Sequence, residues 1–174
     1  NYTGQLQMKH DTVVNQFKRI GHIEDANILP TIGMEEPWRY RNKTQVPFGL
    51  ANGDVVAGFY QKRSHEIIDM RHCLIQTEIS DEIIHEMRGI CRDLKLSPYN
   101  EESNTGILRH VIVRTGFKTD EIMVILVTRK EKIINMDRIV SRLLEKFPQI
   151  KVIAQNINPN VTNAILGEKT NIIY

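Results

Sequence analysis

The dipeptide Asn52-Gly53 constrains the fold of this chain more than any other feature. It separates two runs with strand character, Tyr40–Leu50 and Val55–Gln61. Asn-Gly is the strongest short signal for a β-hairpin, because both residues tolerate a positive φ. A third run, Glu66–Gln76, follows the hairpin. Pro47 lies inside the first strand and has no backbone N–H, so we expect an edge position or a bulge there.

Three amphipathic segments predict helices, and these are Gln5–Ile20, Ser80–Leu94 and Met136–Phe147. Apolar residues recur in each at helical spacing, which places them on one face of a helix. Ser80 is the expected N-cap of the second helix. The expected apolar stripe of the first helix consists of Leu6, Val13, Val14, Phe17 and Ile20.

Further strands are expected at Gly106–Arg114, Glu121–Arg129 and Lys151–Ile157. The middle one is apolar almost without alternation, which is typical of a strand covered on both faces near the centre of a sheet. In the first, alternation places Arg109 on the face of Val111 and His110 on the other. The order of elements predicts an α+β fold: a mostly antiparallel sheet with two helices packed on one face, plus an N-terminal helix.

The composition is that of an ordinary globular protein, with 41% hydrophobic and 25% charged residues among 174. The longest apolar run, Ile122–Val127, is too short to span a bilayer, and no signal peptide is visible. Two cysteines do not form a disulfide framework, so we expect a cytoplasmic protein. The chain begins with Asn1 rather than Met and ends beside apolar residues, so we expect a piece of a longer protein.

Basic residues gather between positions 38 and 72, where six basic residues face three acidic ones and the net charge is +3. Arg39, Arg41 and Lys43 alternate along the first strand and are therefore expected on one face. A local basic face indicates phosphate binding, although a solvated sheet face has the same pattern.

No self-contained active site is visible in the sequence. Glycine-rich phosphate loops, the nucleophile elbow and the zinc motif H-E-x-x-H are all missing. Cys91 falls on an apolar helix stripe and is interpreted as a buried hydrophobe. Cys73 is the one metal-ligand candidate with context, but zinc and iron–sulfur clusters take about four ligands. The residue types alone therefore favour a structural cysteine.

Several segments, taken in order, resemble one family, the S-adenosylmethionine-dependent RNA uracil-C5 methyltransferases, and specifically the 23S rRNA (uracil-5-)-methyltransferases. The resemblance covers nearly the whole chain. Its segments are Trp38–Lys43, Gly58–Tyr60, Ser64-His65, Ile67-Ile68, Cys73, Gly106–Val111 and Thr162–Gly167.

The resemblance implies a division of the chain and a set of neighbouring domains. Residues 1–22 would be a helical linker after a cysteine-cluster segment, and residues 23–174 a central RNA-contacting domain. A TRAM domain and a methyltransferase domain would lie outside the chain. The catalytic cysteine, the carboxylate base and the S-adenosylmethionine site would lie in the latter, so no catalytic residue is expected here.

The resemblance also assigns roles to individual residues. Cys73 matches the position of the fourth ligand of a [4Fe–4S] cluster, whose other three thiolates would come from outside the chain. The residues expected to contact RNA are Arg39, Arg41, Lys43, Arg63 and His65. The expected partner is 23S rRNA, with two alternatives: a tRNA-directed member of the family, or a protein-interaction module without a nucleic-acid role.

Overall fold

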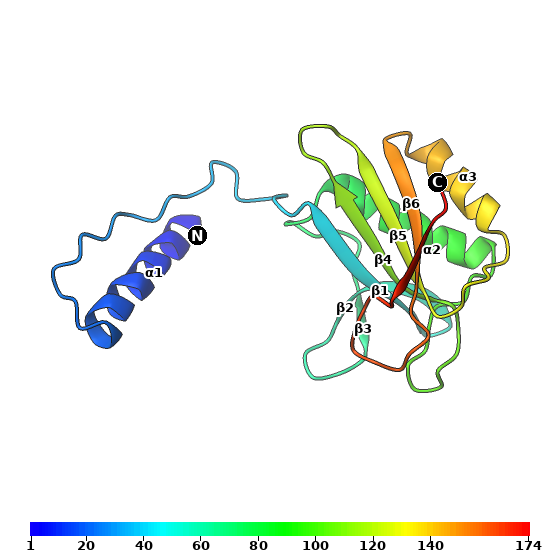
Figure 1. Cartoon of the computed structure of the whole chain (residues 1–174), viewed down its shortest axis with the longest axis horizontal. Helices are drawn as coiled ribbons and strands as arrows, with labels where there is room; N and C mark the ends of the chain where they lie inside the picture. Colours follow the sequence, from blue (N-terminus) through cyan, green and yellow to red (C-terminus); the bar gives the residue numbers. More distant parts are fainter. The chain divides into compact units, whose positions relative to one another are not determined.

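The computed structural model describes all residues, Asn1–Tyr174, and they form two compact units (Figure 1). The first unit is Asn1–Trp38 and the second is Arg39–Tyr174. Neither unit contains a helix that is long and apolar enough to cross a membrane.

The first unit is a helix with an extended segment folded back along it. Helix α1 (Tyr2–Asn15) continues directly into a π-helical stretch, η1 (Gln16–Ile20). The side chain of Asn1 caps the helix by accepting a hydrogen bond from the Gly4 amide at 2.7 Å. The predicted helix is thereby confirmed, and residues 21–38 after it contain no helix or strand.

The covered stripe of α1 differs from the expected one. The half-buried side is formed by Tyr2, Leu6, His10 and Val14, whereas Val13, Phe17 and Ile20 are exposed within this unit. The returning segment is the cause, because the amide of Met34 donates to the Tyr2 hydroxyl at 2.8 Å. A single extended segment covers only a narrow strip of a helix, so no residue of α1 is fully buried.

The second unit is built on one seven-stranded sheet of order β3-β2-β1-β4-β5-β6-β7. All neighbouring pairs are antiparallel except β5 and β6, whose parallel pairing is allowed by the helix between them. The strands are β1 (Lys43–Ala51), β2 (Asp54–Tyr60), β3 (Ile67–Asp69), β4 (Leu108–Thr115), β5 (Ile122–Thr128), β6 (Ile150–Ile157) and β7 (Lys169–Ile172). The hairpin is confirmed, with Asn52 and Gly53 both at positive φ.

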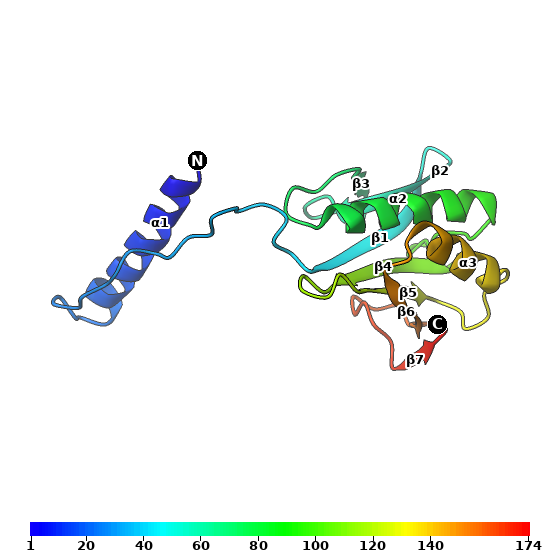
Figure 2. The same cartoon turned by 90° about the horizontal axis from the view of Figure 1, so that it is seen from above.

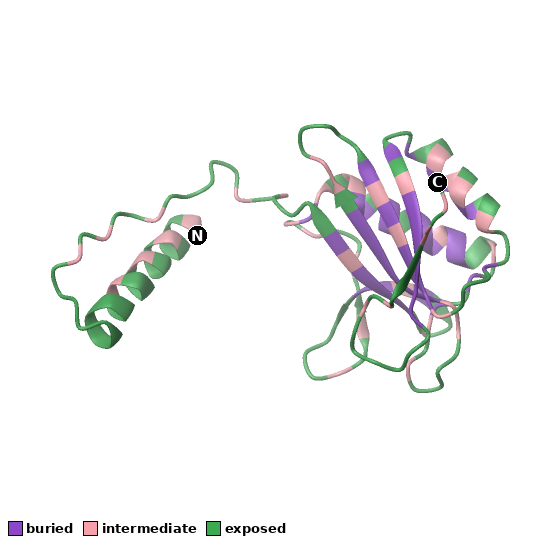
Figure 3. Cartoon of the chain, viewed as in Figure 1, coloured by how far each residue is buried: buried purple, intermediate pink, exposed green.

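Two helices, α2 (Glu78–Asp93) and α3 (Met136–Lys146), pack on one face of this sheet and on each other (Figure 2). The predicted α+β class is thus confirmed. Figure 3 shows the buried residues concentrated in the central strands and the facing helix sides, and none in the first unit. The residue that precedes α2 is Thr77 rather than the predicted Ser80, which lies buried in the first turn.

Pro47 does not mark an edge strand. Strand β1 lies between β2 and β4, and its register to both neighbours is regular. It pairs with β4 over Lys43–Pro47 and with β2 over Phe48–Ala51. Pro47 therefore lies where the pairing passes from one neighbour to the other, and its missing N–H falls at this change of partner.

A β-bulge in β4 places Arg109 on the other face of the sheet from the one expected. The register to β5 shifts between Leu108 and His110, so Arg109 is an extra residue in the strand. Leu108 and Val111 both join the core beneath the helices. Arg109 and His110 instead line the same cavity, so the prediction that Arg109 shares a face with Val111 is wrong.

The run Glu66–Gln76 is mostly loop rather than strand. Only Ile67–Asp69 pairs with β2, and Cys73 lies in the loop that leads to α2. Buried Arg88 of α2 donates to the carbonyl oxygens of Ala57 and Met70. It also forms an ion pair with Asp69 at 2.9 Å, which fixes this edge of the sheet to the helix.

The packing of α2 on the sheet gives a direct test of the fold. Met87 is fully buried between helix and sheet, so Met87→Ala should lower the free energy of unfolding by about 2–5 kcal/mol. His85→Ala is the control, because His85 is exposed on the same helix and should change stability by no more than about 0.5 kcal/mol. Urea denaturation followed by circular dichroism measures both. Equal stabilities would contradict this packing.

Candidate nucleic-acid interface

Three exposed cations meet where β1 begins and β4 ends. Lys43 is the direct cross-strand partner of Arg114, and Arg41 lies two residues before Lys43. The neighbouring pair, Thr44 and Val113, points into the core beneath the helices, so Lys43 and Arg114 project from the opposite face. We call Arg41, Lys43 and Arg114 the cation cluster.

The cation cluster has no counter-charge of its own. None of its three side chains has a carboxylate within 4.0 Å, whereas ten other ion pairs are formed in the chain. Like charges directly opposite each other on neighbouring strands destabilise a sheet. An anion bound between Lys43 and Arg114 would remove that repulsion, so the pair is suited to a phosphate group.

Arg39 is not part of this face. It lies outside β1 with a positive φ of 52°. Its guanidinium turns back and donates to Asp81 at 2.9 Å and to the carbonyl oxygens of Cys73 at 2.6 Å and Gln76 at 3.0 Å. The expected alternation of Arg39 with Arg41 and Lys43 is therefore wrong, because the strand begins only at Lys43. Arg39 instead links the entry to β1 with the loop before α2.

The same ion pair fixes the backbone of Cys73. Asp81 accepts a hydrogen bond from the Cys73 amide at 3.1 Å, while Arg39 holds the Cys73 carbonyl. Cys73 is half-buried and free, and Cys91 lies in the core, where burial raises the pKa of its thiol to about 12. No group of three or more His, Cys, Asp or Glu side chains in the chain is placed to hold a metal ion. The chain alone therefore does not fit a cluster that needs four thiolates.

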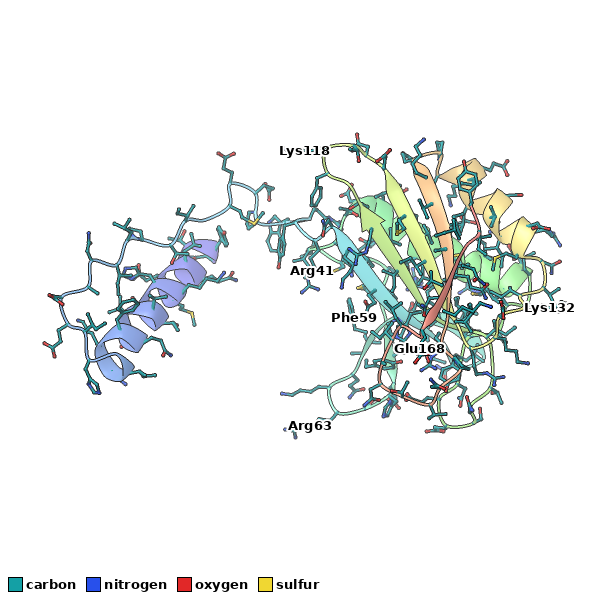
Figure 4. All side chains as sticks on the ribbon, viewed as in Figure 1. Arg41, Phe59, Arg63, Lys118, Lys132 and Glu168 are labelled. Atoms are coloured by element: carbon teal, nitrogen blue, oxygen red, sulfur yellow. The ribbon has the colours of Figure 1, made fainter.

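Arg63 and His65 lie on the turn between β2 and β3. Figure 4 shows Arg63 on this turn, well apart from Arg41 at the start of β1, with Phe59 between them in this view. Arg63 is exposed and has no carboxylate within 4.0 Å. His65 contacts Glu101, with Nδ1 2.9 Å from a carboxylate oxygen. The five predicted RNA contacts are thus distributed over three places.

A cavity of about 1010 Å³ lies beside this turn. It is enclosed by the β1–β2 hairpin, the β2–β3 turn, the loop around Tyr99 and the segment that follows β6. Arg109 is buried at its wall and donates to the carbonyl oxygens of Asn158, Asn160 and Thr162, at 2.6 to 3.2 Å. The cavity belongs to the face of the sheet that carries no helix.

Sequence reasoning missed Arg114 and this cavity. Arg114 alternates with buried Val113, which indicates an exposed strand residue, but its position opposite Lys43 depends on a pairing between distant segments. The cavity depends on the bulge at Arg109, for which β4 carries no glycine or proline as a signal.

The chain resembles known proteins in both sequence and fold. No family model matches the chain. It is 46% identical over 174 residues to a protein from Halalkalibacterium halodurans named uncharacterized RNA methyltransferase, covering all of this chain. Proteins of the same name from Bacillus cereus and Staphylococcus aureus are 47% and 43% identical over 99% and 100% of the chain. The chain spans about 38% of the length of these relatives.

One solved structure has the same fold over nearly the whole chain. It is the tRNA (uracil-54, C5)-methyltransferase of Pyrococcus abyssi in complex with S-adenosyl-L-homocysteine. Its TM-score is 0.73 at 22% identity, over 98% of this chain and 38% of that one. The chain is thus an α+β segment of a kind found within larger RNA-modifying enzymes. Over its whole length the chain is similar in sequence to part of proteins named RNA methyltransferases.

The Arg39–Asp81 ion pair predicts how Cys73 is held. Replacing Arg39 by Ala leaves buried Asp81 without its cation, so stability should fall by about 1–3 kcal/mol. The loop should loosen, and the Cys73 thiol should react faster with Ellman's reagent than in the wild type. Arg41→Ala is the matched control and should change neither quantity. Unaltered thiol kinetics in Arg39→Ala would show that other contacts fix the loop.

Proposed function

We propose that this chain is the RNA-contacting part of an S-adenosylmethionine-dependent methyltransferase that modifies C5 of a uridine. The observation that carries the proposal is the cation cluster, with Lys43 and Arg114 unpaired on one face of the sheet and exposed Arg41 just before β1, in a chain similar in sequence to proteins named RNA methyltransferases. Phosphate contacts of this kind position an RNA without reading its sequence. The chain would therefore orient the substrate rather than perform the chemistry.

The proposed division of labour accounts for the lack of catalytic motifs. Cys91 has surroundings unlike those of an activated nucleophile, since it lies in the core, where burial raises the pKa of its thiol to about 12. The methyl donor and the catalytic groups would be supplied by domains outside residues 1–174. The Pyrococcus relative, named as a uracil C5 methyltransferase in complex with S-adenosyl-L-homocysteine, supports this reaction class.

The proposed substrate is 23S rRNA, on the resemblance of the chain's segments to that branch of the family. A tRNA is the alternative, because the fold relative is named for a tRNA position. Competition between a 23S rRNA fragment and tRNA for the same chain separates the two. Preference for the rRNA fragment supports the first, and preference for tRNA favours the alternative.

Cys73 is proposed as one ligand of a [4Fe–4S] cluster that is completed outside this chain. The fixed backbone of Cys73 supports this, because a metal ligand gains from a support that limits its motion. Arg63 and His65 are proposed as a second RNA contact on the β2–β3 turn. Arg39 is left out of the proposed contacts, because its guanidinium is already bound to protein groups.

The cation cluster predicts salt-dependent RNA binding. Arg114→Ala or Arg41→Ala should weaken binding of a single-stranded RNA. The slope of log K against log salt should become shallower by about 0.7 for each phosphate that the variant no longer neutralises. Fluorescence anisotropy at several salt concentrations measures this.

Lys132→Ala is the matched control, because Lys132 is an exposed, unpaired lysine that Figure 4 shows at the other side of the second unit from Arg41. It should leave the slope unchanged. RNA binding without salt dependence, or an equal loss of affinity in all three variants, would contradict the proposed interface.

The cluster proposal predicts the iron content of a longer protein that contains this chain. When that protein is prepared without oxygen, Cys73→Ser should lower iron and sulfide and remove the broad visible absorbance of thiolate-bound iron. Cys91→Ser is the control, because Cys91 is buried away from any site. Equal iron in wild type and Cys73→Ser would make Cys73 a structural residue.

A further inference from the structure

The cavity on the face without helices has the size and wall chemistry of a ligand site. Its volume of about 1010 Å³ is at the upper end of the range of about 300–1,000 Å³ typical for small-ligand sites. Neither cysteine lines it.

One wall of the cavity is aromatic. The rings of Tyr60 and His65 meet edge to face with centroids 6.1 Å apart, which limits the freedom of both. The Tyr60 side chain is nonetheless partly exposed to the cavity. Unstacked bases of single-stranded RNA stack on aromatic rings that are fixed in position and accessible, and Tyr60 offers such a ring.

Arg109 and His110 also line the cavity, and both side chains are buried. Arg109 is buried over the Tyr99 ring, 4.5 Å from its centroid, and has no carboxylate within 4.0 Å. His110, also more than nine-tenths buried, has no partner for Nδ1. Burial and the neighbouring Arg109 charge lower the pKa of His110 to about 4, so its ring is neutral. The unpartnered nitrogens of both residues have almost no accessible surface, so Arg109 and His110 shape the cavity and leave the Tyr60 ring as its accessible recognition surface.

The acidic side chains of the cavity favour the base of a nucleotide over its phosphate. Glu66, Glu101 and Glu102 line it, and these carboxylates repel a phosphate. They accept hydrogen bonds, however, from the N–H groups that every base carries. Arg63, on the turn that closes the cavity, is exposed and unpaired and lies outside the lining. A base inside and a phosphate outside, at Arg63, satisfies both sets of charges.

We propose that this cavity takes up an unstacked base of the RNA, stacked on Tyr60 with its N–H groups toward the glutamates of the lining. The inference rests on the proposed function, because it presumes that the chain binds RNA. It adds a base-holding site to the phosphate contacts of the cation cluster.

The test compares two oligomers of equal length, a short single-stranded RNA of mixed sequence and its abasic ribose-phosphate analogue. Tyr60→Ala should weaken binding of the RNA about 5- to 150-fold, the range for the loss of one base–aromatic stack. It should leave binding of the abasic oligomer unchanged. Tyr60→Phe keeps the ring and should bind both oligomers like the wild type. Tyr60 is partly exposed, so thermal unfolding of both variants should match the wild type.

Arg114→Ala distinguishes failure of this inference from failure of the proposed function. Arg114 lies outside the cavity lining, so its replacement should weaken both oligomers equally. One outcome is that Arg114→Ala weakens both oligomers equally while Tyr60→Ala changes the affinity for the two oligomers by the same factor. That result overturns the base-holding site and leaves the proposed RNA interface supported. If the wild type binds neither oligomer, both proposals fall.

Discussion

The buried guanidinium of Arg109 holds together the face of the sheet that the helices leave uncovered. It donates three hydrogen bonds to backbone carbonyl oxygens of the segment after β6 and lies over the ring of Tyr99. Those carbonyl groups lie outside any strand ladder and would otherwise need other partners. The guanidinium charge is compensated by dipoles and a ring rather than by a carboxylate. Arg109 thereby joins β4 to the segment after β6 at the wall of the cavity.

The cations near the start of β1 have two different roles. Arg39 is committed to Asp81 and to two carbonyl oxygens, and through them it orders the loop that carries Cys73. Lys43 and Arg114 face each other across neighbouring strands with no carboxylate at hand. The first arrangement stabilises the fold, and the second costs stability unless an anion binds. Residues of one charge within a few positions thus serve structure in one case and binding in the other.

Sequence reasoning succeeded where the signal was local. The Asn52-Gly53 turn, the helices α2 and α3 and the apolar strand β5 each follow from a short-range pattern, and the structure contains all of them. The candidate site was predicted only in part. Arg41 and Lys43 were predicted, although only Lys43 lies on the strand, and Arg114, the partner of Lys43, lies about seventy positions further along the chain. The family resemblance predicted RNA contacts on the β2–β3 turn but gave no indication of the cavity beside it.

By itself, the sequence determined the α+β class, the hairpin, the buried faces of α2 and α3 and the concentration of basic residues before position 72. These depend on backbone preferences and on hydrophobic periodicity, which act over a few residues. Only the tertiary structure decided that Pro47 lies at a change of strand partner, that a bulge turns Arg109 toward the open face, and that Arg39 bends back to Asp81. Each of these depends on which distant strand or helix supplies the partner, and a local pattern carries no information about that choice.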